Sequence, residues 1–336
     1  MRQQVETIQK KIDFSGAVLV KGENIEFHEA YGYAERSNKI SNTVQTRFGI
    51  ASSCKLFTAI AICQLAESGT LDLNGKVQNY LDFNFPHFDA SITLHHLLTH
   101  TSGVPDYFDE DEMDDFEALW QDIPMYNLRR LEDFIPLFGD RKMKFSPGER
   151  FHYNNAGYIL LGLVVESVSG MVFEDYIEQF IFNRAGMNSS GYFSFDRLPE
   201  HVATGYIELE DDTWKSNIYS LPVKGGADGG AFTTVEDMDR LWDALMSGSI
   251  LNQEYTSLLL EPHAQEDDVS FYGYGVWIDK NSGTIEKYHV MGYDPGISFH
   301  SAYYPESKMK LVVCANQSEG AYDIMETIED AMDEKA

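Results

Sequence analysis

The sequence predicts an α+β protein in which both ends of the chain build one antiparallel sheet around an inserted, mainly helical lobe. Strand-like runs occur near the N-terminus and again after Phe271, whereas helical runs and proline-marked loops fill the middle. A lone hairpin is rarely stable by itself, so the early strands need the late strands as partners. We therefore expect a discontinuous sheet domain, residues 1–75 and 205–336, and a mainly helical domain, residues 76–204.

The N-terminal segments are expected to form a helix, two strands and a second helix, in that order. An amphipathic stretch precedes the strand-like runs Gly16 to Val20 and Ile25 to Tyr31, which a short polar turn separates. The segment from Ser52 to Glu67 is apolar on nearly all sides, with Lys55 as its only charge before Glu67, and Gly69 follows where a helix should stop. This segment is expected to be a buried central helix.

The middle and the C-terminal end show different patterns. A helical run at Ile159 to Val168 lies among loops marked by prolines and glycines, and the acidic stretch Asp106 to Asp115 is expected to be a solvated loop or helix face. The C-terminal segments are expected to form strands and a final amphipathic helix; they cover Tyr274 to Ile278, Ile285 to Met291, Ile297 to Tyr303, Lys310 to Ala315 and about 321–332.

The charge balance excludes some classes of partner. The 336 residues include 25 Lys and Arg against 54 Asp and Glu, a formal net charge of -29, which repels phosphate backbones and anionic lipids. No run approaches the roughly 18 apolar residues that a membrane span needs, and the N-terminus lacks the apolar core of an export signal. We expect no nucleic-acid partner, no membrane span and a cytoplasmic location, unless an export signal has been trimmed; the oligomeric state stays open.

The cysteines and histidines do not follow a metal-binding pattern. Cys54, Cys63 and Cys314 include no closely spaced pair, and the first two fit small buried side chains in a reducing compartment. His96 and His100 are four residues apart and could share a helix face, but no H-E-x-x-H motif or nearby cysteine accompanies them. We therefore expect no metal and no other cofactor.

The strongest catalytic signal is Ser52 followed three residues later by Lys55 at the start of the central helix. Residues three apart share a helix face, so the hydroxyl and the amine can meet. An ammonium in apolar surroundings releases its proton more readily, which suits the removal of a proton from serine. The helix start adds partial positive charge and free N–H groups. Ser52 is the candidate nucleophile, although a serine at this position can also be a simple cap.

A second motif, Tyr153-x-Asn155, lies between a Pro-Gly turn and an apolar helix. Alone it is typical of a helix start with an asparagine cap. Together with Ser52-x-x-Lys55 it resembles the motifs of the serine β-lactamase and penicillin-binding-protein family, in particular class C β-lactamases, D,D-peptidases and related esterases. The segments 94–105 and 225–238 resemble connecting elements of that family, so the resemblance runs from about residue 14 to residue 316.

The resemblance implies a β-lactamase/transpeptidase-like fold and an acyl-enzyme mechanism. Ser52 would attack a carbonyl while Lys55 and the Tyr153 phenol share the proton transfers. Asn155 would hydrogen-bond the substrate amide or the lysine. The backbone N–H groups of Ser52 and Tyr293 would form the oxyanion hole.

The third family motif departs from the pattern. The family usually carries Lys-Thr-Gly or His-x-Gly on a strand beside the site, followed by Pro-Gly, whereas this segment reads Y-H-V-M-G-Y-D-P-G. Alignment on Gly292 puts Val290 and Met291 where the family has its cation and hydroxyl, and leaves His289 one residue early. Successive strand residues face opposite sides, so His289 would need a bulge to reach the site. His289, Gly292 and Tyr293 are the substrate-binding candidates from this strand.

The sequence accordingly predicts a serine hydrolase that acts on an ester or a small amide through a Ser52 acyl-enzyme. A penicillin-binding protein or a weak β-lactamase is the alternative within the same family, and the missing cation counts against efficient β-lactam hydrolysis. A non-catalytic ligand-binding protein on the same fold is the alternative from another class.

Overall fold

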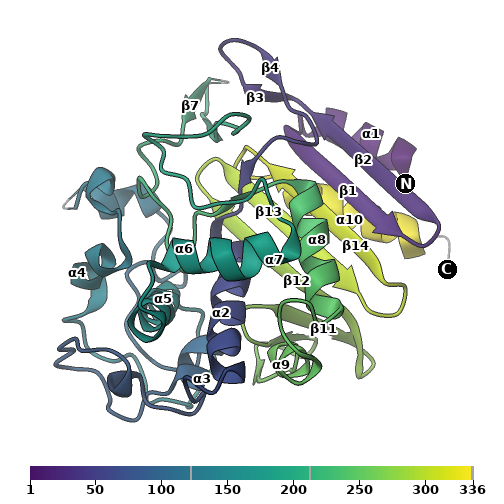
Figure 1. The fold of residues 1–336 in the computed structure, drawn as a ribbon. Coiled ribbons are helices and arrows are strands. Elements are labelled where there is room, and N and C mark those ends of the chain that lie inside the picture. The colour runs from purple at the N-terminus through teal and green to yellow at the C-terminus, as the bar shows by residue number, and fades with distance from the viewer. Residues whose placement is uncertain (122, 212, 334–336) are drawn as a thin grey trace.

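The computed structural model describes residues 1–121, 123–211 and 213–333. Its main sheet is antiparallel throughout, and the strands stand in the order β2-β1-β14-β13-β12-β11-β10-β9 (Figure 1). These strands are β1 (Gly16–Gly22), β2 (Ile25–Tyr31), β9 (Ala264–Gln265), β10 (Ser270–Tyr272), β11 (Trp277–Asn281), β12 (Thr284–Asp294), β13 (Ile297–Tyr304) and β14 (Met309–Ala315). The pairing of β1 with β14 joins the two ends of the chain and confirms the predicted sheet.

Both faces of this sheet are covered, which explains why β14 is apolar from Leu311 to Ala315. The helices α1 (Arg2–Lys11) and α10 (Ala321–Asp333) lie on one face, where Val313 belongs to their core, and α8 (Val235–Met246) lies on the other (Figure 1). Neighbouring strand residues point to opposite faces, so Val312 and Cys314 join the second core instead. On that side the Trp242 indole donates a hydrogen bond of 2.8 Å to the Ser301 hydroxyl.

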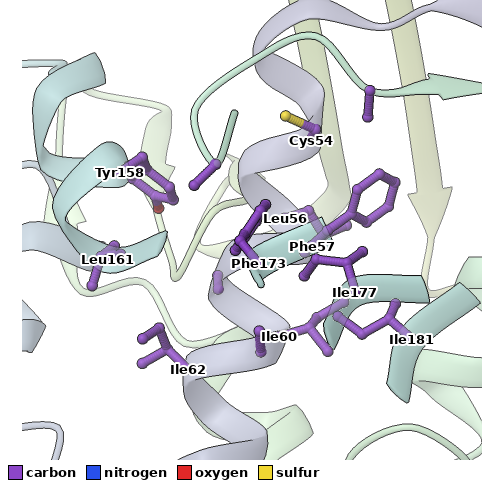
Figure 2. Close-up of a cluster of buried hydrophobic side chains, with 14 of the residues drawn as sticks. Cys54, Leu56, Phe57, Ile60, Ile62, Tyr158, Leu161, Phe173, Ile177 and Ile181 are labelled. Atoms are coloured by element: carbon purple, nitrogen blue, oxygen red, sulfur yellow. The ribbon is translucent and has the colours of Figure 1, made fainter. Parts of the chain in front are cut away.

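The predicted central helix is α2 (Lys55–Glu67), and it is buried on all sides. A 3₁₀ turn, η1 (Ala51–Cys54), precedes it, so Ser52 lies one turn before the α-helix itself. Leu56, Phe57 and Ile60 pack toward α6 (Phe173–Ile177) and the π-helical turn η6 (Glu178–Phe182) (Figure 2). Because water has no access to this helix, the lysine at its start must be satisfied by protein groups.

The middle of the chain is a mainly helical lobe with many short elements, as predicted. Its longest helix, α5 (Asn155–Ser169), packs against α2, and the core cluster around α2 includes residues from both expected domains. The expected domain boundaries stay a prediction. The remaining helical elements are η2 (Val77–Asn79), α3 (Leu94–Leu98), η3 (Phe116–Trp120), η4 (Met125–Asn127), η5 (Leu131–Phe134), α4 (Ile135–Phe138), α7 (Asn183–Ala185) and α9 (Gln253–Leu259).

Three short strand pairs lie outside the main sheet. They are β3 (Tyr33–Glu35) with β4 (Ile40–Ser41), β5 (Phe48–Gly49) with β8 (Phe232–Thr233), and β6 (Tyr206–Glu208) with β7 (Trp214–Ser216). The pair β5–β8 brings two segments together, because β5 leads into η1, which contains Ser52, and β8 follows the glycine-rich loop 225–230.

The predicted strand Tyr274 to Ile278 is wrong in its first half. The chain forms β10 and β11 on either side of a turn at Gly273 to Val276. Gly275 has φ +69°, and a Cβ there would lie 2.7 Å from the Lys55 carbonyl oxygen. The close passage over α2 therefore requires a glycine in a conformation that an extended strand does not allow.

No single helix in the described part of the chain is long and apolar enough to cross a membrane. Only α5 and the following segment Phe173–Ala185, taken together, meet that criterion by length and composition, and they are bent by 77° relative to each other.

Gly162 in the middle of α5 gives a test of how tightly the helical lobe packs on the glycine-rich loop. A Cβ there would lie 2.4 Å from the Ala227 Cβ and 2.6 Å from Leu131 Cδ1. Glycine to alanine normally stabilises a helix by about 1 kcal/mol, but overpacking a core costs about 1–3 kcal/mol. We expect Gly162→Ala to lower the free energy of unfolding by up to about 2 kcal/mol in urea denaturation.

Gly157→Ala in the same helix is the matched control, because its nearest neighbours would lie 3.2 and 3.5 Å away. We expect a smaller loss there. A Gly162→Ala variant more stable than the wild type would show that α5 and the loop are not in close contact.

Candidate active site

Ser52 lies at a strained turn that opens onto a cavity. Ala51, the residue before it, has φ +46°, a left-handed conformation that is unfavourable for any residue with a side chain. The adjacent Ser53 is 1% exposed, and its N–H donates to the Ile50 carbonyl at 3.1 Å. Ser52 lines the cavity and Ser53 does not. Of the two neighbouring serines, Ser52 is thus the one that a substrate can reach.

The Lys55 amine is buried and has three hydrogen-bond partners. Its Nζ lies 2.9 Å from Ser52 Oγ, 2.8 Å from Asn155 Oδ1 and 2.7 Å from the Asp228 carbonyl oxygen. The Asn155 amide is oriented by its own Nδ2, which donates to the Phe108 carbonyl at 3.2 Å. The structure thus brings together the predicted residues Ser52, Lys55 and Asn155.

This arrangement suits an amine that takes up a proton from the serine. The Asn155 and Asp228 oxygens can only accept, so each occupies one N–H of the lysine. A neutral amine has two N–H groups and one lone pair, and the lone pair then points at Ser52. When Lys55 is an ammonium, its third N–H donates to Ser52 instead. The same three contacts therefore hold both protonation states.

The Tyr153 phenol joins this group from the segment just before α5. The Lys55 Nζ lies 4.9 Å from the centre of the Tyr153 ring. Burial raises the pKa of the Tyr153 phenol well above its ordinary value, the Glu110 carboxylate adds to this, and a hydrogen bond with Ser52 acts in the opposite direction. The phenol therefore keeps its proton at neutral pH and is available as a donor.

His100 and Trp277 hold the Tyr153 ring. The ring centres of His100 and Tyr153 are 4.4 Å apart, and Trp277 stacks at 6.2 Å. The Asn154 N–H donates to His100 Nδ1 at 3.1 Å, and burial lowers the pKa of the His100 imidazole well below its ordinary value. His100 is thus a neutral support for the tyrosine. Because α3 ends at Leu98, it does not share a helix face with His96.

Asp106 is a site residue that the sequence interpretation missed. It is 3% exposed, and its carboxylate accepts the N–H groups of Asn155 at 2.6 Å and Ala156 at 3.0 Å, at the start of α5. Burial raises the pKa of this carboxyl to about 7. The expectation of a solvated acidic stretch is wrong here and at the buried Asp109, which pairs with Lys144. Pairing with backbone groups and a lysine allows these carboxylates to be buried.

Asp228 is the second missed residue. It lies in the glycine-rich loop 225–230, is 4% exposed and accepts a hydrogen bond from the Tyr107 hydroxyl. Burial raises the pKa of the Asp228 carboxyl, and the Lys55 charge acts against this. Its backbone carbonyl is one of the partners of Lys55. The sequence indicated only a connecting loop here.

The free edge of β12 lies against the turn that carries Ser52. The pairing of β11 with β12 ends at Trp277 and His289, so residues 290–294 have an edge without a neighbouring strand. A Cβ at Gly292 would lie 2.3 Å from the Ile50 carbonyl oxygen and 2.9 Å from the Ser52 nitrogen. Only glycine allows this approach. The edge brings the backbone at Gly292 and Tyr293 beside Ser52, where the oxyanion hole is expected.

His289 lies on the other face of the sheet. It pairs across the strands with Ala302, which belongs to the core under α1 and α10. Its Nε2 lies 3.3 Å from Asp279 Oδ1, an ion-pair contact without good hydrogen-bond alignment. The register of β12 and β13 runs without a bulge along their described lengths. The structure therefore does not bring His289 to Ser52, and the strand alternation gives the reason.

The cavity in front of Ser52 has a volume of about 830 Å³ and is lined by acidic groups. Among the described residues that line it, none is a lysine, arginine or histidine. Eight carboxylate side chains do line it: Glu110, Asp114, Asp115, Glu117, Asp228, Asp294, Glu319 and Asp323.

Within the described residues, one group has the spacing of a metal site: Asp109, Asp111 and His152. The Lys144 ammonium already pairs with Asp109 and lies 3.4 Å from His152 Nε2. A lysine charge therefore stands where a cation would bind. We assign no metal to this cluster.

Three comparisons place the chain among known proteins. A family model described as Beta-lactamase matches residues 1–331. Penicillin-binding protein 4* of Bacillus subtilis (strain 168) is 30% identical over 334 residues, 94% of this chain and 70% of that protein. The crystal structure of a penicillin binding protein from Bacillus halodurans is 59% identical, with a TM-score of 0.94 over 97% of this chain and 99% of that chain.

A more distant structure shows the same fold. The D-amino acid amidase from Ochrobactrum anthropi SV3 is 20% identical, with a TM-score of 0.82 over 100% of this chain and 99% of that chain. At this identity the likeness concerns the fold alone.

The close approach of Gly292 to the turn that carries Ser52 gives a prediction. In Gly292→Ala the new methyl group would overlap the Ile50 carbonyl and the Ser52 nitrogen, so the strand must move away from Ser52. We expect the rate of acylation by an activated ester to fall by about 10²- to 10³-fold, the loss typical of one oxyanion donor. Stopped-flow release of p-nitrophenol measures it.

Gly283→Ala is the control, because nothing lies within 4 Å of a Cβ there, although its φ of +84° adds some strain. Its acylation rate should stay close to that of the wild type. Equal rates in both variants would mean that the edge of β12 has no part in the reaction.

Proposed function

Because the chain belongs to the serine β-lactamase and penicillin-binding-protein family, we propose that it hydrolyses an ester or a small amide through an acyl-enzyme on Ser52. The observation that carries the proposal is the buried Lys55 amine, which contacts the serine hydroxyl and two oxygens that can only accept. A purely structural lysine would not need a partly exposed serine at the mouth of a cavity.

Acylation begins when the Ser52 hydroxyl gives its proton to the lone pair of Lys55. The serine oxygen bonds to the substrate carbonyl carbon, and the carbonyl oxygen takes the negative charge. The N–H groups of Ser52 and Tyr293 stabilise that charge. The carbon–leaving-group bond then breaks as the Tyr153 phenol donates its proton to the leaving group, and Lys55 returns a proton to the phenol.

Deacylation repeats these steps with water in place of the serine. Lys55 accepts a proton from the water, either directly or through the Tyr153 phenol, which passes its own proton to Lys55 as it takes one from the water. The water oxygen then attacks the ester carbonyl of the acyl-enzyme. The bond to Ser52 breaks, the serine oxygen recovers its proton, and the carboxylic acid leaves. Since these amine and phenol groups are in contact, their protons belong to a coupled pair.

The first experiment asks whether Ser52 is the nucleophile. We expect a fluorophosphonate probe to label the wild type at Ser52, as located by mass spectrometry of the digested protein, and to leave Ser52→Ala unlabelled. Ester hydrolysis should fall by about a thousandfold or more in this variant.

Ser53→Ala is the matched control, since Ser53 is buried and does not line the cavity. Labelling should persist there. A label on another residue, or full activity in Ser52→Ala, would rule out the acyl-enzyme at Ser52.

The second experiment tests the Tyr153 phenol as proton donor to the leaving group. In Tyr153→Phe we expect kcat/KM for an alkyl ester to fall by about 10²-fold or more. The loss for the matching p-nitrophenyl ester should be much smaller, because p-nitrophenolate leaves without a proton. Equal losses for both esters would assign the tyrosine a packing role.

A penicillin-binding or weak β-lactamase activity is a second candidate, favoured by the 59% identity to a penicillin binding protein. The acidic cavity counts against it, because a β-lactam carries a carboxylate. Mass spectrometry after incubation with a chromogenic cephalosporin distinguishes three outcomes: no adduct, a lasting Ser52 adduct, or turnover. A lasting adduct with esters as well would favour the non-catalytic ligand-binding alternative.

A further inference from the structure

The distribution of charge around Ser52 favours one class of substrate. The cavity is lined by carboxylates, and the cationic groups nearest to them are already engaged. The Lys215 Nζ lies 2.8 Å from each Glu117 carboxylate oxygen, and the Lys55 amine lies behind Ser52 with its three partners. An anionic substrate group would find no free cation among the described residues that line the cavity.

Asp294 is the carboxylate best placed to contact a substrate. It lies at the end of β12, two residues after Gly292, and lines the same cavity as Ser52. Its side chain is partly buried, and within the described residues no hydrogen bond or ion pair to its carboxylate is found. A half-buried carboxylate without a partner is costly, and a ligand cation would satisfy it.

The neighbours of Asp294 strengthen this preference. Burial is the main cause that raises the pKa of the Asp294 carboxyl to about 7. The Asp228 and Glu110 carboxylates add to this increase, and the Lys55 charge acts against it. Another positive charge placed here would be attracted by several carboxylates at once. A substrate carboxylate at the same place would be repelled by them.

The strand β12, which carries the third family motif, also favours an ammonium over a carboxylate in the substrate. The side chains of Val290 and Met291 stand where the family has its cation and hydroxyl. Val290 is buried in the core, so it offers no polar contact to a ligand. The strand therefore lacks the group that would receive a substrate carboxylate, and its next free polar side chain is Asp294.

We propose that this site selects acyl donors that carry an ammonium group near the scissile carbonyl and disfavours those that carry a carboxylate, with Asp294 as the residue that receives the ammonium. The inference rests on the proposed Ser52 acyl-enzyme. It identifies Asp294 as a specificity-determining residue and names the substrate class by its charge.

Three p-nitrophenyl esters of equal chain length test the proposal: one ends in trimethylammonium, one in its neutral isostere tert-butyl, and one in carboxylate. We expect kcat/KM for the ammonium ester to exceed that for the neutral ester by about tenfold or more, and the carboxylate ester to be slower than the neutral one. In Asp294→Asn the ratio of ammonium to neutral ester should fall toward one.

Two further variants separate the local effect from the charge of the whole chain. Asp268→Asn removes one exposed carboxylate that does not line the cavity, and it should leave the ratio unchanged. Asp294→Glu keeps the charge and should keep most of the preference, even if a loss of packing lowers all three rates. Thermal unfolding of each variant shows that it is folded.

The outcomes distinguish this inference from the proposed function. If none of the esters acylates Ser52, the proposed function fails. If all three acylate Ser52 but the ratio is near one, or the carboxylate ester is the fastest, only the charge preference is overturned. If the preference for the ammonium ester survives in Asp294→Asn, the other carboxylates cause it and Asp294 does not receive the ammonium.

Discussion

The structure of the site depends on the burial of one amine. Moving an ammonium out of water costs several kcal/mol, and Lys55 is 1% exposed in a helix whose other buried residues are all uncharged. Its hydrogen bonds offset that cost only if Ser52, the α5 asparagine and the glycine-rich loop stand at fixed distances. The lysine therefore ties three distant segments of the chain together, and the cost of breaking any of these contacts keeps the site in one arrangement.

Hydrogen bonds between loops and helices also hold the elements around the Lys55 amine in place. Asp106 binds the first N–H groups of α5 and so sets where Asn155 points. The Ala227 carbonyl accepts a hydrogen bond of 2.6 Å from Thr58 of α2, which holds the next residue of the loop, Asp228, beside Lys55. Each contact joins a loop to a helix whose register is set by the core. The loops of the site are thus held by helices that the sheet and the core keep in place.

The features that were predictable from sequence are those with a local pattern. The apolar run Leu311 to Ala315 of β14 and the mostly apolar α2 follow from burial on every side. Ser52, Lys55 and Asn155 are marked by their spacing. Asp106 was not predictable, because it begins an acidic run and its burial depends on α5, which arrives some fifty residues later. The apolar neighbours Val104 and Tyr107 were the only local signal. Asp294, the proposed specificity residue, could have been identified from the sequence, because it lies two residues after Gly292 of the third motif.

The common core of the two lobes affects how mutation can change the site during evolution. Since α2 and α5 share one apolar cluster, the lobes cannot swing apart without exposing that cluster to water. The access of a molecule to Ser52 therefore depends on the residues that line the cavity. Exposed residues of its lining, such as Asp114 and Glu319, can be replaced without touching the amine, the phenol or the serine. Mutation can therefore alter which compounds enter the cavity while the arrangement of Ser52, Lys55 and Tyr153 stays intact, so a single scaffold can diversify its ligands step by step.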